Sequence, residues 1–152
     1  PDGMTTRAML VSILYRMAGE PDVSELPETP FEDVGPDAWY ADAVRWAYAN
    51  EVAAGMDDTH FAPDDRLTRA QLVTMLYRAY GPEKGVRPRP IGGYTDWNTV
   101  PEWAYPAATW AVSMGLLYGT SSTQLSPNAG ANRAQLAAFM MRTCELQSEL
   151  DA

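Results

Sequence analysis

One stretch of this chain is written three times, and this repetition constrains the fold more than any other feature. Residues 63–78 read PDDRLTRAQLVTMLYR, and residues 1–16 and, more loosely, 127–142 follow the same pattern. The seventh position of this box is arginine in each copy: Arg7, Arg69 and Arg133. Self-similarity at a regular period indicates small units that cannot bury their apolar faces alone. We therefore expect the copies to pack on one another.

A second repeated segment lies between the boxes. Residues 31–55 and 94–119 share an aromatic residue, an Asp two positions later, two tryptophans and a closing glycine. Each full repeat therefore has a front half and a back half. No front half precedes the first box, so we expect it to lie upstream, although another chain or residues 143–152 are alternatives.

Composition excludes several classes of protein. The chain has 46% hydrophobic residues, which excludes disorder, and a net charge of −9, which disfavours nucleic acid and anionic membranes. No apolar run approaches the roughly 18 residues of a membrane span, so we expect no membrane insertion. Cys144 is the only cysteine, so no disulfide framework or thiol-rich metal site is expected. A polyanion would have to be captured at a local cationic site.

Each box predicts a helix, because its apolar residues recur at helical spacing. Thr6, Thr68 and Asn132 are the predicted N-caps. Gln71 and Gln135 stand three residues after their caps and can close capping boxes, whereas Met9 cannot.

The front halves also predict helices, from the spacing of Trp39, Ala43 and Trp46 and their counterparts. Gly115 is the expected end of the later helix, and at the matching end we expect Asn50, rather than Glu51, to supply the turn. Strand signals are weak, so the predicted fold is all-α with long ordered loops.

The arginines stand in the first helical turn, where the helix dipole disfavours a cation. One interpretation is an anion site, in which helix N–H groups and the guanidinium bind a carboxylate or phosphate. The other is structural, with each arginine paired to a nearby carboxylate such as Asp33 or Asp96. The residues alone leave both open.

The tryptophans also have two interpretations, a sugar-stacking platform or a wedge in the core. Their place on an apolar stripe favours the core for Trp39 and Trp103, and most strongly for Trp46 and Trp110. The Asp57-Asp58-Thr59 segment lacks the ligand periodicity of a calcium loop, and no metal or cofactor is expected. No nucleophile and base recur together, so we expect no enzyme activity.

In their order and spacing, these motifs resemble the S-layer homology (SLH) repeat. The likeness rests on Phe31-x-Asp33-Val34, Trp39, Ala43-Val44, the turn Gly55-x-x-Asp58-x-x-Phe61-x-Pro63, and the box Leu67-Thr68-Arg69-Ala70-Gln71. It implies one domain made of the back half of repeat 1 (1–20), repeat 2 (31–81) and repeat 3 (94–143). The implied fold is a pseudo-threefold arrangement of helical repeats around a central helix bundle.

The resemblance also implies a function: non-covalent binding of bacterial cell-wall polysaccharide in grooves between repeats, at the cell surface. The implied ligand is a secondary cell wall polymer, often ending in pyruvylated N-acetylmannosamine, whose carboxylate the motif arginines contact. The candidate ligand-binding residues are Arg69, Arg7, Arg133, Gln71, Gln135, Trp39, Trp103, Asp33 and Asp96.

The copies differ, and the differences rank the candidate sites. The family commonly has Glu where this chain has Gln71, Gln135 and Met9, and the turn after Gly119 lacks the Asp and the Phe. We therefore expect the Arg69 copy, with its intact preceding turn, to be the best preserved, and the rewritten turn to weaken the Arg133 copy. Alternative functions are self-assembly of a surface layer, including self-association through the incomplete first repeat, and a part of a wall-active enzyme.

Overall fold

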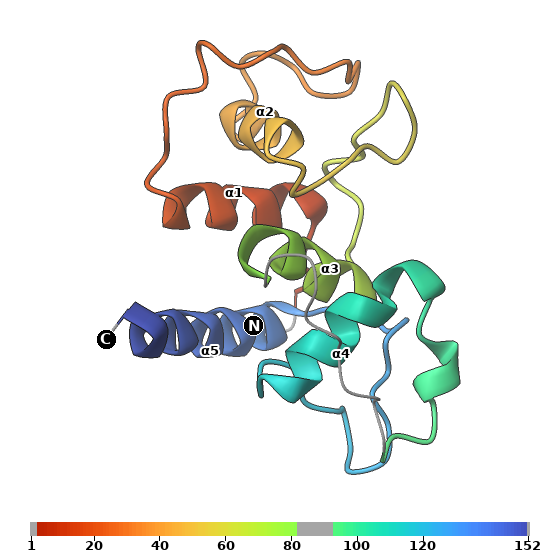
Figure 1. Ribbon diagram of the computed structural model, residues 1–152. Coiled ribbons are helices and arrows are strands. Elements are labelled where there is room, and N and C mark those ends of the chain that lie inside the picture. The colour runs from red at the N-terminus through yellow and green to blue at the C-terminus, as the bar shows by residue number, and fades with distance from the viewer. Residues whose placement is uncertain (1–2, 82–92, 152) are drawn as a thin grey trace. The chain divides into compact units, whose positions relative to one another are not determined.

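The computed structural model describes residues 3–81 and 93–151, which form helices joined by long loops (Figure 1). The helices are α1 (Arg7–Met17), α2 (Ala41–Ala49), α3 (Arg69–Tyr80), α4 (Tyr105–Ser113) and α5 (Arg133–Asp151), with two short 3-10 helices, η1 (Trp97–Thr99) and η2 (Glu102–Ala104). Over these residues no β-strand forms, which confirms the all-α class. None of the described helices has both the length and the apolar composition needed to cross a membrane.

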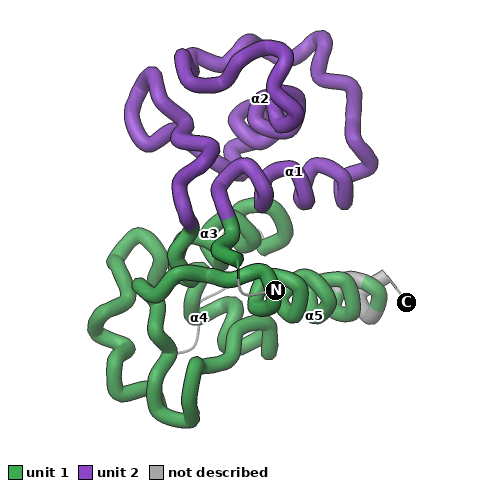
Figure 2. The backbone as a smooth tube through the Cα atoms, turned by 180° about the vertical axis from the view of Figure 1, so that it is seen from behind, with its two compact units in different colours: residues 1–5, 67–152 green, residues 6–66 purple. Residues whose placement is uncertain are grey.

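The chain divides into two compact units (Figure 2). Unit 1 comprises residues 1–5 and 67–152, and unit 2 comprises residues 6–66. In unit 2, α1 packs against α2; in unit 1, α3 packs against α4 and η2. Each of these pairs joins the helix of one box to the helix of the front half that follows it. The predicted repeat boundaries at 1–20, 31–81 and 94–143 stay predictions.

The three box helices begin where their caps predict. Thr68 Oγ1 accepts a hydrogen bond from the Gln71 amide at 3.1 Å, and the Gln71 side chain accepts one from the Thr68 amide at 2.9 Å. Asn132 and Gln135 form the same reciprocal pair. Thr6 Oγ1 accepts a hydrogen bond from the Met9 amide. The bond is not reciprocated, because the apolar side chain of Met9 cannot accept one from the Thr6 amide. These bonds satisfy amides that a helix start leaves unpaired.

The front-half helices end in matching turns. In α4 the turn falls on Gly115, at φ +69°, as predicted. In α2 the equivalent residue is Glu51, at φ +58°, so the expectation that Asn50 would supply this conformation is wrong. The cause is the hydrogen-bond pattern at the end of each helix. The amides of Val52 and Leu116 both bond the carbonyl five residues earlier, and this bond places the preceding residue in the left-handed conformation regardless of its side chain.

The helices are held by apolar faces buried at helical spacing. In α1 and α3 the fully buried side chains occupy matching positions: Leu10, Val11, Leu14, Leu72, Val73 and Leu76. Trp110 is buried against Tyr77, with ring centres 5.5 Å apart, whereas Trp46 is half-buried beside Tyr15. Burial of each such side chain contributes roughly 1.5–3 kcal/mol.

A closed ring of three backbone hydrogen bonds lies within unit 1. The amide of Thr5 donates to the carbonyl of Ala131 at 2.8 Å, Ala131 donates to Leu67 at 2.9 Å, and Leu67 donates to Thr5 at 2.9 Å. All three residues occupy the fifth position of the box, and all are completely buried. The fifth positions of the three boxes therefore meet within unit 1, each one residue ahead of a helix cap in the sequence.

The hydroxyl of Thr5 is the one polar side-chain group in this ring, because the other two members are Leu67 and Ala131. Among the described residues it has no hydrogen-bond partner. We predict that Thr5→Val stabilises the protein by about 1 kcal/mol, because it removes an unsatisfied buried hydroxyl without changing side-chain shape. Urea denaturation measures this change.

Thr74→Val is the matched control, because the buried hydroxyl of Thr74 donates to the Ala70 carbonyl at 2.8 Å. We expect this variant to lose stability. Equal destabilisation by both substitutions would contradict the interpretation of Thr5.

Candidate functional site

Arg7, in unit 2, turns its side chain inward against a loop. Its Nε donates to the Phe61 carbonyl at 2.9 Å and its Nη2 to the Ala54 carbonyl at 2.5 Å. The guanidinium carbon lies 4.6 Å from the centre of the Phe61 ring, and the residue is only 5% exposed. One arginine therefore joins both ends of the 54–62 turn.

Arg69 makes the same two hydrogen bonds in unit 1. Its Nε donates to the Leu125 carbonyl at 3.2 Å and its Nη2 to the Tyr118 carbonyl at 2.5 Å, and the residue is 6% exposed. Leu125 and Tyr118 are the counterparts of Phe61 and Ala54. We call this arrangement the arginine grip.

The grip corrects the pairing of arginines with turns. The sequence interpretation joined each turn to the arginine that follows it in the same repeat. The structure instead joins the 54–62 turn to Arg7 and the 118–126 turn to Arg69, each preceding its turn in the chain. The rewritten third turn therefore belongs to the Arg69 copy, so ranking Arg133 by it was wrong.

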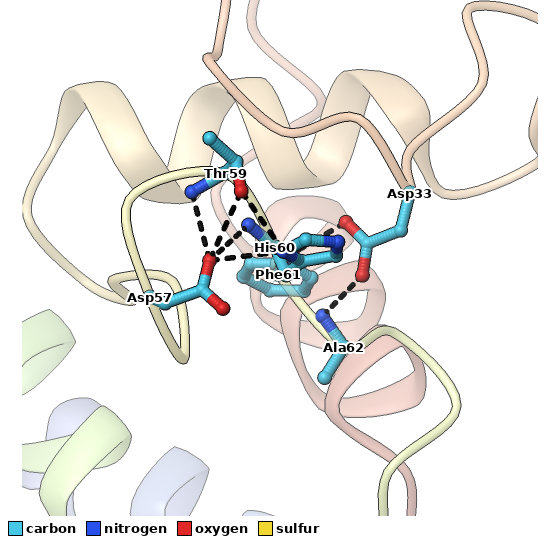
Figure 3. A network of polar contacts seen from close by, with 6 residues as sticks. All are labelled: Asp33, Asp57, Thr59, His60, Phe61 and Ala62. Carbon is cyan, nitrogen blue, oxygen red and sulfur yellow. Dashed lines mark hydrogen bonds and ion pairs between the residues drawn. The ribbon is translucent and has the colours of Figure 1, made fainter.

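The two turns also share a second anchor, an aspartate of the front half. Asp33 accepts the amides of Phe61 and Ala62, both at 2.8 Å, as Figure 3 shows. Asp96 accepts the equivalent amides of Leu125 and Ser126, at 2.8 and 2.9 Å. In both turns the second of these residues is in the left-handed region, at φ +57° for Ala62 and +54° for Ser126. The carboxylate thereby stabilises a conformation that a side chain disfavours.

Close packing also limits each turn at its glycine. A β-carbon at Gly55 would lie 2.5 Å from both the Asp57 carbonyl oxygen and the Phe31 ring. At Gly119 it would lie 2.5 Å from the Gln124 carbonyl oxygen. The turn therefore needs glycine at this position for space.

The outer ends of the two turns differ in side chains but share a hydrogen-bond pattern. In the first, Asp57 Oδ1 accepts the amides of Thr59 and His60 and contacts His60 Nδ1 at 3.0 Å (Figure 3). This hydrogen bond raises the pKa of His60. In the second, Ser121 Oγ replaces the carboxylate and accepts the amides of Thr123 and Gln124. Over the described residues no cluster of three or more acidic, His or Cys side chains is placed to hold a metal.

Burial affects the charged forms of Asp96 and Arg69 differently. Burial would raise the pKa of Asp96, but the amides of Leu125 and Ser126 outweigh burial, and the pKa lies below its ordinary value. Burial lowers the pKa of Arg69, and the charge of Asp96 only partly offsets this effect. No carboxylate among the described residues forms an ion pair with Arg69. Its charge is therefore stabilised mainly by carbonyl dipoles.

Arg133 is placed differently from the other two arginines. It is exposed at the start of α5, where its backbone amide donates to the Gly3 carbonyl at 2.9 Å. Gln71 and Gln135 lie in the capping boxes and are half-buried.

Trp39 and Trp103 are 67% and 56% exposed, so the interpretation that favoured the core for them is wrong. They precede α2 and α4 and so do not continue the buried stripes of these helices. Trp97 is also exposed, at 51%, and the sequence interpretation did not select it. The sequence signal that could have selected Trp97 is its position directly after Asp96.

The S-layer homology domain family matches this chain twice, over residues 30–73 and 93–137, more than half of its length. The chain is 34% identical over 119 residues to a surface-layer 125 kDa protein of Lysinibacillus sphaericus, covering 76% of the chain and 10% of that protein. It is 31% identical over 144 residues to an endoglucanase of Bacillus sp. strain KSM-635, covering 93% of the chain and 15% of that protein.

A cellulosome-anchoring protein of Acetivibrio thermocellus is 24% identical over 155 residues, with 95% of this chain and 33% of that protein covered. The chain thus spans only a tenth to a third of the length of these relatives.

The aspartate anchor predicts acid sensitivity. Because the pKa of Asp96 is lowered on folding, its contribution is present above its ordinary value of 3.8 and is lost as the pH falls through the lower folded value. We predict that Asp96→Asn costs about 1–3 kcal/mol at neutral pH, since an amide cannot accept both backbone bonds. We also predict that this variant loses less stability than the wild type below about pH 4.

Thermal unfolding over a pH series measures both effects. Asp37→Asn is the control, because Asp37 is exposed and lies outside the turn. An Asp96→Asn protein with wild-type stability and wild-type acid dependence would contradict the anchor.

Proposed function

The chain belongs to the S-layer homology family, and from this premise we propose that it anchors a bacterial surface protein non-covalently to secondary cell wall polysaccharide. The single observation that carries the proposal is the double family match, which covers both front halves and most of their boxes. Relatives named as surface-layer and cellulosome-anchoring proteins support a module that acts at the cell wall. The location that follows is the bacterial surface.

We propose that the polymer is recognised partly through a carboxylate, such as that of pyruvylated N-acetylmannosamine. Arg69 supports this choice, because its buried charge has no ion-pair partner among the described residues and its pKa is lowered by burial. An arginine has five N–H donors, and the grip uses one on Nε and one on Nη2. An incoming carboxylate would use the remaining donors and supply the missing counter-charge.

Because the chain has a net charge of −9, recognition of the polymer depends on the local positive charge of the arginine. A polyanionic wall polymer is repelled at long range by an acidic protein, so its capture depends on short-range contacts. Arg7 and Arg133 are the corresponding cations of the other copies. In this proposal Asp33 and Asp96 hold the turns in place, while Gln71 and Gln135 fix the helix starts beside the arginines.

The exposed tryptophans are the proposed sugar-stacking surfaces. Trp39 and Trp103 lie at equivalent positions ahead of α2 and α4, one in each unit, and both rings are more than half exposed. Large exposed aromatic side chains present a flat apolar face that suits the C–H face of a sugar ring. We propose that the module binds and does not catalyse, and that the activity of a relative such as the endoglucanase belongs to other parts of that protein.

Binding to purified wall sacculi tests the function directly. We expect the chain to sediment with sacculi that carry the polymer and to stay in solution after the polymer is extracted. Undiminished retention on extracted sacculi would contradict polymer anchoring. Mild acid that removes the pyruvyl group from the free polymer should then weaken its binding to the unaltered protein.

We predict that Trp103→Ala binds the polymer about two- to twelvefold more weakly, because one stacking contact is worth roughly 0.5–1.5 kcal/mol. Its thermal stability should be close to wild type, because the ring is 56% exposed. Calorimetric titration with soluble polymer measures the affinity. Met114→Ala, which removes another exposed apolar side chain of unit 1, is the control, and equal losses in the two variants would argue against a specific platform.

A further inference from the structure

Residues 94–100 and 119–130 of unit 1 form one surface, which we call the turn face. Asp96 accepts two backbone amides of the second segment, at 2.8 and 2.9 Å. The side-chain amide of Asn128 donates to the Thr99 carbonyl at 2.9 Å. These bonds hold the two segments side by side.

Trp97 is the one large apolar side chain exposed on the turn face. It is 51% exposed, and among the described residues no other aromatic ring and no arginine stacks on it. At the matching position unit 2 has Val34, which is half-buried. Of the two units, only unit 1 therefore presents an aromatic ring at this point.

Two exposed side-chain amides on the turn face retain hydrogen-bonding capacity. Gln124 Nε2 donates to Thr95 Oγ1, and Asn128 Nδ2 donates to the Thr99 carbonyl, both at 2.9 Å. In the described part of the chain these are the only hydrogen bonds of the two side-chain amides. Each amide has a second N–H donor and a carbonyl oxygen that accepts. A donor and an acceptor of each thus remain for a ligand, on groups that the existing bonds orient.

The charge of the turn face differs from that of the matching residues in unit 2. Asp96 is the one charged residue of the turn face, and the backbone amides of the turn occupy its carboxylate. Exposed carboxylates of unit 2 stand at positions that are uncharged in unit 1: Glu32, Asp57, Asp58, Asp64 and Asp65 match Thr95, Ser121, Ser122, Asn128 and Ala129. An acidic polymer is repelled by the acidic surface and tolerated by the uncharged one.

The turn of unit 2 also uses its polar side chains internally. His60, the counterpart of Gln124, contacts Asp57 through Nδ1 at 3.0 Å and Thr59 at 2.9 Å (Figure 3). This ring nitrogen is therefore occupied within the turn.

We propose that the turn face of unit 1 is a contact site for uncharged sugar units of the wall polymer, with Trp97 stacked on the face of one sugar ring. Gln124 and Asn128 bond hydroxyl or acetamido groups at the edge of that ring. The matching residues of unit 2 do not bind the polymer, because their carboxylates repel it. The assignment of a sugar ligand rests on the polymer anchoring proposed above, and it adds a contact that does not depend on the charge of the polymer.

A protein is a poorer occupant of the turn face. Protein interfaces have a contiguous apolar centre. On the turn face a single ring, that of Trp97, is surrounded by exposed hydroxyl and amide side chains. This combination of one flat apolar surface with donors and acceptors beside it suits a sugar ring.

Calorimetric titration with soluble polymer tests the stacking contact. We expect Trp97→Val, which gives unit 1 the residue of unit 2, to bind about two- to twelvefold more weakly, as the loss of one aromatic contact implies. Its melting temperature should stay close to that of the wild type, because the ring is 51% exposed. Met141→Val, which shortens another exposed apolar side chain of unit 1, is the control and should bind as the wild type does.

Two further measurements separate stacking from charge. The loss in Trp97→Val should persist with polymer from which mild acid has removed the pyruvyl group. Asn128→Asp, which gives unit 1 the carboxylate found at Asp64, should weaken binding of the intact polymer, and this loss should shrink at high salt and with the treated polymer. Asp64→Asn is the matched control in unit 2 and should change the affinity less.

Nitrogen-15 NMR of the indole N–H groups gives a readout at the site itself. The Trp97 signal is identified by its absence from Trp97→Val. We expect this signal to shift as polymer is added to the wild type.

The outcomes distinguish the turn-face site from the anchoring function. If the wild type binds the polymer while Trp97→Val binds equally well and the Trp97 signal does not move, the turn-face site is overturned and anchoring stands. If Trp97→Val alters self-association in sedimentation velocity but not polymer affinity, the occupant is a second copy of the chain, and the sugar site is likewise overturned. A wild type that does not bind the polymer would contradict anchoring itself, and the sugar contact with it.

Discussion

The ring of three backbone hydrogen bonds among Thr5, Leu67 and Ala131 is the constraint on which the other features depend. Backbone groups make these bonds, so the ring tolerates threonine, leucine or alanine at one repeated position. Each ring residue is followed by a helix cap and then by an arginine. Once the ring forms, each arginine leaves the box at an equivalent point. Arg7 and Arg69 each bond two carbonyls at equivalent positions, on turns of different sequence.

At Arg69 the grip places a cation in a buried setting and stabilises it with carbonyl dipoles, and no carboxylate in the described part of the chain forms an ion pair with it. A buried charge without a close counter-charge is costly, and in Arg69 the cost is visible as a lowered pKa. The nearby aspartate is committed to the backbone of the turn. An acidic protein that binds an acidic polymer needs a residual local positive charge of this kind, and this links the packing of the turn to the proposed function.

Much of the fold was predictable from local sequence signals. The caps at Thr6, Thr68 and Asn132 located the box helices, and Gly115 located one helix end. These signals act over a few residues, so they can be read from a linear sequence.

Long-range features were not predictable in the same way. Trp39 and Trp103 fit a buried stripe by spacing but lie outside the helices that create the stripe. The carbonyls that Arg7 and Arg69 bond lie between 47 and 56 residues away in the sequence, and repetition alone cannot tell which copy of a turn meets which arginine. Native-state amide hydrogen exchange tests the central claim directly. The account predicts that the amides of Thr5, Leu67 and Ala131 exchange slowly and at similar rates; exchange of any of the three as fast as in exposed loops would contradict it.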